Sequence, residues 1–472
     1  MGGFFGVVSE KDCSHDLFYG VDYHSHLGTK RGGLAVFDGK KIKHVIHNIE
    51  NTPFRSKFEY DLDQLNGNSG IGCISDKEAQ PLTIKSSLGL YSISTVGKIN
   101  NIKELSDRLL KTQKTHFFEM SSGEINQTEL VAAIINNSDS FESGINEVYN
   151  SIDGSISILI LADNGIYAAR DRLGRTPIIV AKRGNDYCVT FETCAIYNLG
   201  FSYEYELGPN EVVFVDTSGI KKITPPREEM QMCAFLWVYY GFAASTYEGR
   251  NVEEMHYESG RLLAHNDEVK ADIVAGVPDS GTSSAIGYSL ERNIPFSRPF
   301  MKYTPTWARS FMPQNQSIRD LVAKMKLIPV ADMIKGKKII FCEDSIVRGT
   351  QMLDACNLLY SCGAEEVHMR VASPPIVRLC KFLNFSSSTT AKTLITERAI
   401  KRIEGGEVNY LNEYCKSDSE KYNLMIEEIR KELGFKTLKF IKLEDVIEAI
   451  GLPEEKICTY CFKCNSAKMS DD

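Results

Sequence analysis

The residues between 338 and 359 have the pattern of a phosphate-binding loop between a strand and a helix. Residues 338–342 are largely apolar, residues 343–350 read Glu-Asp-Ser-Ile-Val-Arg-Gly-Thr, and residues 352–359 place apolar side chains on one helical face. The unpaired N–H groups at a helix N-terminus, together with the helix dipole, favour an anion. Ser345 and Thr350 add hydroxyl donors. The pattern therefore predicts a site for a phosphate group.

Two acidic side chains and a glycine belong to the same loop. Glu343 and Asp344 follow the predicted strand at its carboxyl end, which is where open α/β sheets bind ligands. Two carboxylates at this position suit sugar hydroxyl groups or a magnesium ion. The alternative is that they cap the following helix. Gly349 would let the backbone come close to the anion.

Taken together, the strand, the acidic pair, the loop and the helix resemble the signature with which type I phosphoribosyltransferases bind 5-phosphoribosyl 1-pyrophosphate (PRPP). The resemblance implies that Glu343 and Asp344 hold the 2′ and 3′ hydroxyl groups of the ribose. It also implies that the 5′-phosphate is held by Ser345, Ile346, Val347, Arg348, Gly349 and Thr350. The family more often has Asp at the position of Glu343, so the reach is longer here while the charge is kept.

Two more segments match the same family in order along the chain. Residues 277–281 (Val-Pro-Asp-Ser-Gly) resemble the tight loop that takes the pyrophosphate through backbone amides, which implies substrate contacts for Asp279, Ser280 and Gly281. Residues 302–311 resemble the loop that folds over bound PRPP, with Lys302 and Arg309 on the pyrophosphate. Lys326 matches a further pyrophosphate-facing lysine. For any single Lys or Arg, the alternative is an ordinary solvated surface charge.

The order of motifs along nearly the whole chain, as far as residues 373–375 (Ser-Pro-Pro), resembles glutamine PRPP amidotransferase. In the first half the resemblance rests on residues 79–81 (Ala-Gln-Pro), 170–174 (Arg-Asp-Arg-Leu-Gly) and 191–194 (Phe-Glu-Thr-Cys). It implies an N-terminal Ntn-hydrolase-like domain, a four-layer αββα sandwich in which an N-terminal cysteine attacks glutamine. For the second half it implies a type I phosphoribosyltransferase domain with a parallel sheet.

The residues that this family uses on glutamine are replaced in this chain. Glycine stands where the nucleophilic cysteine should follow Met1, and the carboxylate-binding arginine, the oxyanion-hole asparagine and the amine-binding aspartate align with cysteine, valine and glutamine. These degenerate positions are Gly2, Cys73, Val96 with the adjacent Gly97, and Gln127. Processing to a new N-terminus at Cys13 is the alternative, but it would remove the strand predicted at residues 3–8. We therefore expect no glutaminase activity.

Cys458 and Cys461 form a C-x-x-C motif, which alone fits zinc binding, redox chemistry or no special function. In the iron–sulfur branch of the amidotransferases, such a motif shares a cluster with one cysteine after Ser-Pro-Pro and one just after the domain boundary. Cys380 and Cys233 occupy those places. Four thiolates can hold a [4Fe-4S] cluster or a Zn²⁺ ion, and the resemblance favours the cluster. Cys464 has no assigned role.

The pattern of predicted strands and helices changes near the middle of the sequence. Short strands with turn signals precede residue 225, whereas strand, loop and helix alternate after it, which predicts an α+β half followed by α/β units around a parallel sheet. We expect an Ntn-hydrolase-like domain at residues 1–230, a phosphoribosyltransferase domain at 231–400, and a C-terminal helical extension with the cysteine cluster at 401–472.

Composition narrows the class of partner. Of 472 residues, 25% are charged and 43% apolar, as in ordinary soluble globular proteins, and the net charge of −8 argues against nonspecific attraction to nucleic acid. No apolar run approaches the roughly 20 residues of a membrane-spanning helix. We expect a cytoplasmic protein that binds neither nucleic acid nor membranes.

Two functions remain open at this point. The first is a glycosyltransferase of the amidophosphoribosyltransferase type in purine biosynthesis, which uses PRPP with Mg²⁺ and takes ammonia or another amine, free or from a separate glutaminase. The second is a regulatory or scaffold protein that binds PRPP or a nucleotide without turnover. The family resemblance also suggests a homo-oligomer.

Overall fold

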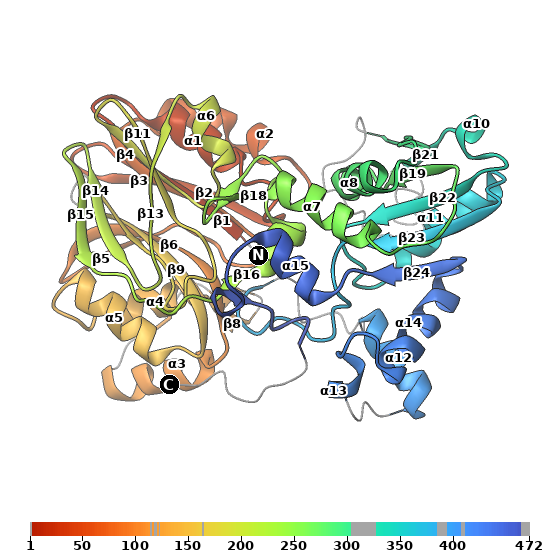
Figure 1. Cartoon of the computed structure of the whole chain (residues 1–472). Helices are drawn as coiled ribbons and strands as arrows, with labels where there is room; N and C mark the ends of the chain where they lie inside the picture. The colour runs from red at the N-terminus through yellow and green to blue at the C-terminus, as the bar shows by residue number, and fades with distance from the viewer. Residues whose placement is uncertain are drawn as a thin grey trace.

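The structure is a computed structural model that describes residues 2–113, 116–117, 120–121, 123–162, 165–303, 327–384, 394–406 and 411–463. These residues form two lobes, with α7 (Val252–Ala264) and α15 (Leu443–Ile450) between them (Figure 1). The first lobe holds two large antiparallel sheets. The second holds a parallel sheet flanked by helices.

A seven-stranded antiparallel sheet begins with the first described residues. Its strand order is β13-β11-β12-β1-β4-β2-β3, formed by Ser202–Glu206, Ile179–Arg183, Asp186–Thr190, Gly2–Val8, Ser69–Ser75, Arg31–Phe37 and Ile42–Asn48. The central strand β1 pairs with β12 on one side and with β4 on the other, with Gly2 opposite Ser75. The start of the chain is therefore held inside a sheet.

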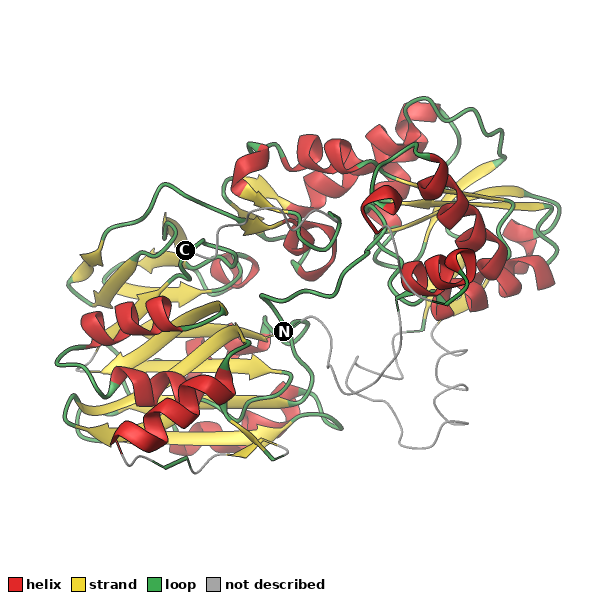
Figure 2. Ribbon diagram, turned by 90° about the horizontal axis from the view of Figure 1, so that it is seen from below, coloured by secondary structure: helices red, strands yellow, loops and turns green. Residues whose placement is uncertain are grey.

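A six-stranded antiparallel sheet packs against the first one. Its order is β15-β14-β10-β9-β6-β5, formed by Gly219–Thr224, Val212–Asp216, Gly165–Ala169, Gly154–Ala162, Gly89–Ile99 and Leu82–Ser86. Helices cover the outer faces of both sheets (Figure 2). They are α1 (Ser14–Asp22), α2 (Phe54–Phe58) and α6 (Cys194–Asn198) on the first sheet, and α3 (Ile102–Gln113), α4 (Gln127–Ile135) and α5 (Phe141–Ser151) on the second.

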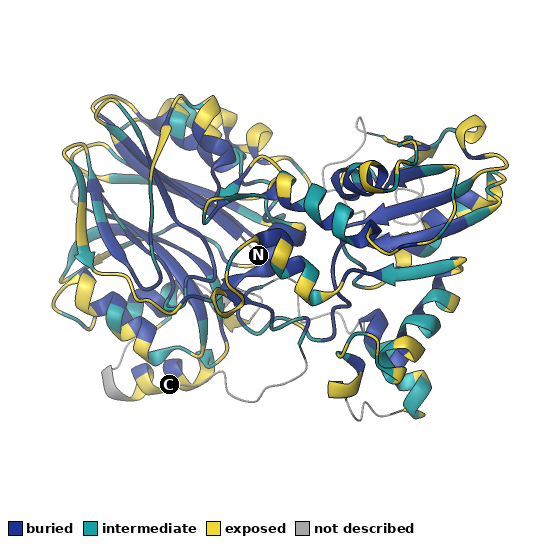
Figure 3. Cartoon of the chain, in the orientation of Figure 1, coloured by how far each residue is buried: buried dark blue, intermediate teal, exposed yellow. Residues whose placement is uncertain are grey.

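Alternation of side chains along the strands builds these layers. In β1, Phe4 and Val8 face the core between the two sheets, whereas Phe5 and Val7 face the core beneath α1. Both cores are fully buried (Figure 3). The expected four-layer αββα sandwich is confirmed.

The second lobe is built on a four-stranded parallel sheet with the order β19 (Ile273–Gly276), β22 (Lys338–Glu343), β23 (Glu366–Val371) and β24 (Thr437–Phe440). Ile340 and Cys342 of β22 face the core shared with α7 and α8 (Thr282–Arg292), whereas Ile339 and Phe341 face α11 (Thr350–Ser361) and α14 (Glu420–Leu433). Helices therefore lie on both faces, as parallel sheets require. The expected phosphoribosyltransferase sheet is confirmed.

The segment after residue 401 is joined to both lobes. It supplies α14 and strand β24 to the second lobe, and strand β25 (Ile457–Cys458) pairs in parallel with β16 (Met232–Cys233) near the junction of the lobes. The domain limits expected from the sequence stay predictions. None of the helices in the described ranges is both long and apolar enough to cross a membrane.

Candidate functional site

The predicted phosphate loop joins the carboxyl end of β22 to the first turn of α11. Arg348 and Thr350 are exposed, Ser345 and Val347 are half-buried, and Ile346 is buried in the core of the second lobe. The N-cap of α11 is Gly349, which has no side chain to cap the helix. Glu343 and Asp344 precede this N-cap by six and five residues.

Gly349 has a φ of 81°, in the left-handed region that favours glycine. A Cβ atom there would lie 2.5 Å from Cδ1 of Ile395 and 3.0 Å from Cδ2 of Leu433. These side chains belong to α12 (Ile395–Glu404) and α14. Glycine is therefore required by its backbone conformation and by two helices that pack behind the loop, a reason that the sequence did not suggest.

The two acidic side chains are buried and hydrogen-bonded. Glu343 is 4% exposed, and its Oε1 accepts from Oγ of Ser280 at 2.6 Å and from the Asp344 N–H at 3.0 Å. Ser345 Oγ donates to Oδ1 of Asp344 at 2.8 Å. Burial, and then the charge of Asp344, raise the pKa of Glu343 well above its usual range. The hydrogen bond from Ser280 to Glu343 therefore links the loop at residues 277–281 to the loop at residues 343–350.

Residues 277–281 lie directly beside the end of β22. A Cβ on Gly281 would come within 2.1 Å of the carbonyl oxygen of Cys342, so the loop backbone touches the strand. Asp279 is exposed, and Lys302 Nζ donates to its Oδ2 at 2.9 Å. The two loops and Lys302 therefore meet at one edge of the sheet. Arg309 and Lys326 lie outside the described residues.

The four degenerate positions lie in the first lobe and are packed. A Cβ on Gly2 would lie 2.6 Å from the backbone oxygen of Ile74 on the neighbouring strand, and one on Gly97 would lie 2.0 Å from that of Ser155. Val96 is 3% exposed and belongs to the core between the sheets. Close backbone contacts and apolar packing occupy these positions.

Cys73 and Gln127 are also engaged within the fold. Cys73 is fully buried, its Sγ lies 3.4 Å from the backbone oxygen of Gln80, and burial raises the pKa of its thiol to about 12. Gln127 is 4% exposed, and its Oε1 accepts from the N–H of Ile99 at 2.9 Å. Neither side chain offers the charge that the carboxylate or the amine of a glutamine needs.

The four predicted cysteine ligands converge from three segments. Cys233 and Cys458 are register partners in β16 and β25, and the backbone oxygen of Cys461 accepts from the Val377 N–H at 3.0 Å. Cys380 lies three residues beyond Val377, and every pair among the four thiol groups interacts electrostatically. Burial raises the pKa of Cys233 and Cys461 well above the usual range of a thiol.

A buried cation lies against these cysteines. Arg175 is 4% exposed, its guanidinium lies 3.6 Å from the ring centre of Phe382, and its backbone oxygen accepts from the Cys233 N–H. Within the described ranges, Nε of Arg175 has no hydrogen-bond partner. In the same ranges, no three His, Cys, Asp or Glu side chains are arranged to hold a single metal ion. Arg175 places a positive charge near the thiol group of Cys380.

Comparison with known proteins covers almost the whole chain. The amidophosphoribosyltransferases of Bacillus subtilis and Methanocaldococcus jannaschii are each 28% identical, over 99% and 98% of this chain and 93% and 96% of theirs. A solved glutamine PRPP amidotransferase from B. subtilis, complexed with ADP and GMP, superimposes with a TM-score of 0.83 at 27% identity, covering 98% of this chain and 96% of that one. The chain is therefore similar over almost its whole length to the amidophosphoribosyltransferases.

A family model described as a glutamine amidotransferase domain matches residues 70–198. In this chain, the match covers Cys73, Val96 and Gln127 but begins after Gly2. It supports the fold of the first lobe and does not include the position of the nucleophile.

Three contacts in this chain were not predicted from the sequence. They are the Ser280–Glu343 hydrogen bond, the packing of α12 and α14 behind Gly349, and the approach of Arg175 to the cysteines. Each joins residues that are more than 40 positions apart. Only the longer side chain of Glu343 gave any signal in the sequence, because its reach exceeds that of the usual Asp.

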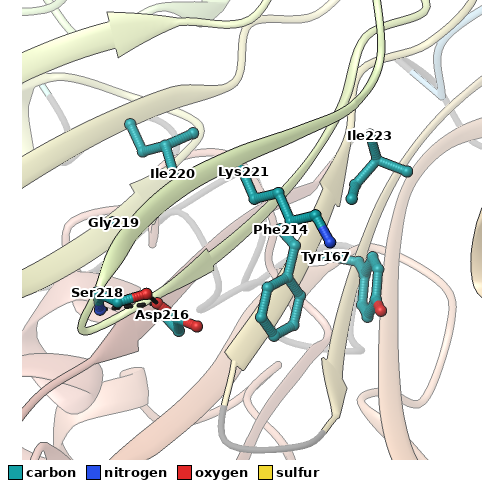
Figure 4. Close-up of a pocket in the computed structure, with 8 residues that line it drawn as sticks. All are labelled: Tyr167, Phe214, Asp216, Ser218, Gly219, Ile220, Lys221 and Ile223. Atoms are coloured by element: carbon teal, nitrogen blue, oxygen red, sulfur yellow. Dashed lines mark hydrogen bonds between the residues drawn. The ribbon is translucent and has the colours of Figure 1, made fainter.

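One further pocket lies on the outer face of the six-stranded sheet and has a volume of about 350 Å³ (Figure 4). The rings of Tyr167 and Phe214 lie 4.7 Å apart within it. The rest of its lining comes from the β14–β15 hairpin: Asp216, Ser218, Gly219, Ile220, Lys221 and Ile223. None of the predicted site residues lines this pocket.

Proposed function

We propose that this chain is an amidophosphoribosyltransferase-type glycosyltransferase of purine biosynthesis that transfers ammonia to C1 of PRPP and releases pyrophosphate. The observation that carries the proposal is the meeting of two loops, residues 277–281 and 343–350, at the carboxyl ends of the adjacent parallel strands β19 and β22. Ligands of open α/β sheets bind at such an edge. The names of the full-length relatives support the same reaction.

In this proposal the second lobe positions PRPP and stabilises charge. The N–H groups of residues 345–350 hold the 5′-phosphate, and Glu343 and Asp344 accept from the ribose hydroxyl groups. Backbone amides of residues 277–281 and Lys302 hold the pyrophosphate as it leaves. By resemblance, Arg309 and Lys326 add positive charge. Magnesium would screen the pyrophosphate charge, and positioning with charge stabilisation supplies most of the rate.

The balance of bonds is simple. The C1–O bond to pyrophosphate breaks with its electron pair going to the leaving oxygen, and ammonia forms the new C1–N bond through an oxocarbenium-like transition state. A proton then leaves the nitrogen. No nucleophilic side chain is needed, so the loss of the cysteine at Gly2 does not affect this step.

The nitrogen source in the proposal is ammonia, free or delivered by a separate glutaminase. Its support is the packing of the four degenerate positions, because Gly2 has no side chain and the backbone of Ile74 closes the space beside it. Cys73, Val96 and Gln127 also lack the charges and the donor that hold glutamine in the related enzymes.

The test is pyrophosphate release by the full chain with PRPP and magnesium, with ammonium or glutamine as the only nitrogen donor. We expect release with ammonium and none with glutamine. Release with glutamine alone would overturn the nitrogen assignment and leave the transferase intact. Binding of PRPP without release under either donor would favour a second function.

That second function is a sensor or scaffold that binds PRPP or a nucleotide without turnover. One observation favours it: Glu343 and Asp279 are engaged by Ser280 and Lys302 in the structure described above. Binding must exchange these bonds for bonds to the ligand. Such a ligand-dependent rearrangement can signal as readily as it can catalyse.

We also propose that Cys233, Cys380, Cys458 and Cys461 hold a [4Fe-4S] cluster that ties the junction of the lobes together. Four thiolates around such a cluster carry net negative charge, which Arg175 would offset. Iron and acid-labile sulfide in anaerobically purified protein, with an absorption band that dithionite bleaches, would support the cluster. Stoichiometric zinc without iron would replace it with the zinc alternative. Self-association and cytoplasmic location remain expectations, and light scattering checks the first.

A further inference from the structure

The phosphate loop is supported from behind by two helices that come much later in the chain. The N–H at the start of α12, in Ile395, donates to the backbone oxygen of Val347 at 3.0 Å. Ile395 and Leu433 of α14 also fill the space next to Gly349. The loop is therefore bonded and packed on the side that faces α12 and α14.

One side chain of α12 reaches the loop directly. Nη2 of Arg398 donates to the backbone oxygen of Arg348 at 2.9 Å, and it also donates to Oε1 of Glu432 on α14. Arg398 thus spans three elements: its own helix, the second helix and the loop. Its head group is about one-third exposed, and Glu432 about one-quarter.

The orientation of a loop carbonyl affects the neighbouring N–H groups, because each peptide unit is planar and carries its C=O and N–H on opposite sides. A carbonyl of Arg348 that is held toward Arg398 directs the next N–H, that of Gly349, away from α12. N–H groups that are set before a ligand arrives cost less entropy on binding.

We propose that Arg398 is a positioning residue for the phosphate loop: braced by Glu432, it holds the carbonyl of Arg348 and so sets the N–H groups that take the 5′-phosphate. It touches no reacting atom. The inference rests on the proposed function of the loop and deepens it. It makes part of the affinity for the 5′-phosphate depend on side chains of α12 and α14.

Arg402 provides a matched control on the same helix. Its guanidinium also donates to Glu432 and lies 3.8 Å from Glu428, but it makes no hydrogen bond to the loop in the parts of the chain that are described. Arg398→Ala and Arg402→Ala therefore remove the same charge and the same ion-pair partner from one helix. Only the first removes the bond to the loop.

The experiment is calorimetric titration of the full chain with ribose 5-phosphate, with magnesium pyrophosphate and with PRPP. We expect Arg398→Ala to weaken ribose 5-phosphate about tenfold, which corresponds to one charge-assisted hydrogen bond, and PRPP by a similar factor. Pyrophosphate affinity should change less than about twofold. Arg402→Ala should leave all three within about twofold, and Arg398→Lys should recover part of the loss.

Hydrogen exchange gives a second reading that does not depend on affinity. The amides of residues 347–350 should exchange faster in Arg398→Ala than in Arg402→Ala. Equal exchange, equal affinities in the two variants, or an equal loss for pyrophosphate would overturn the positioning role. If Arg398→Ala does not fold, Arg398→Lys and Glu432→Gln take its place. Failure of the unaltered chain to bind any of the three ligands would instead reject the proposed function.

Discussion

The two lobes differ in the residues that occupy their predicted sites. In the first lobe, the positions that correspond to a glutamine site are filled by close backbone contacts at Gly2 and Gly97 and by the apolar side chain of Val96. In the second lobe, the edge keeps acidic, hydroxyl and cationic side chains that bond to one another. The two lobes therefore offer a ligand different surroundings.

This difference between the lobes determines which of the two sites can admit a ligand. A site that is filled by backbone and apolar packing gains stability and cannot admit a ligand without a shift of strands. A site whose polar groups bond internally, as Ser280 does to Glu343, can exchange those bonds for a ligand at little net cost. Under the proposed function, the chemistry is therefore expected in the second lobe.

The largest expected effect is at the acidic pair. Asp344→Asn keeps the shape and removes the charge, so PRPP turnover with ammonium should fall by about 100-fold or more, because charge-assisted bonds to the ribose are lost. Asp354→Asn, on the exposed face of α11, is the matched control and should keep nearly full activity. Initial rates of pyrophosphate release measure both. Equal activity of the two variants would show that the acidic pair of the second lobe does not carry the reaction.

Loss of one clustered cysteine should affect the junction of the lobes. Cys461→Ser should lower the iron content and the thermal midpoint of unfolding, because a cluster or a metal that binds only the folded state stabilises it. Cys362→Ser, a half-buried cysteine of the second lobe outside the cluster, should leave both nearly unchanged. An unchanged midpoint and metal content in Cys461→Ser would argue that the four thiols hold nothing.

A cysteine at position 2 tests whether the first lobe can regain a glutamine site. Gly2→Cys should gain no glutaminase activity and should destabilise the chain by about 1 to 3 kcal/mol, because its Cβ would press on the backbone of Ile74. Gly2→Ala carries the same Cβ without sulfur and should cost about the same. Denaturant unfolding and a glutamine hydrolysis assay report the two effects. Hydrolysis by Gly2→Cys would contradict the packed-site interpretation.

The smallest effect concerns pH. Burial raises the pKa of Glu206 to about 7, although Arg170 lowers it and Glu248 raises it further. A carboxyl whose pKa is raised on folding stabilises the fold below its unfolded pKa of about 4.5, and this contribution is lost as pH rises through about 7. Glu206→Gln should flatten the dependence of unfolding free energy on pH between these values, by an amount on the order of 1 kcal/mol. Urea titrations at several pH values measure it.

Much of the fold follows from local patterns in the sequence. The apolar segment at residues 3–8 predicts a strand, and the structure buries both of its faces. The apolar run before Glu343 predicts the strand that carries the phosphate loop. The order of the motifs then predicts two sheets of different kinds. These features depend on residues that are close together in the chain.

What could not be predicted depends on distant residues. The sequence predicted that Gly349 is needed for the close approach of a phosphate. In the structure, Ile395 and Leu433 also fill the space beside it, and no local pattern in the sequence places them there. The length of the Glu343 side chain was noticed, whereas its partner Ser280 was not. Arg175 follows the motif at residues 170–174 and was assigned no role from the sequence, and only the fold brings it to Phe382 and Cys233.

Strand β24 has a consequence for how the chain folds during synthesis. Its residues, 437–440, pair with residues of β23 that lie 69 positions earlier, so the parallel sheet lacks this strand until residues 437–440 have left the ribosome. Until then one edge of β23 is unpaired and can associate with other chains. A premature stop before Thr437 should therefore yield aggregates rather than a shortened folded chain.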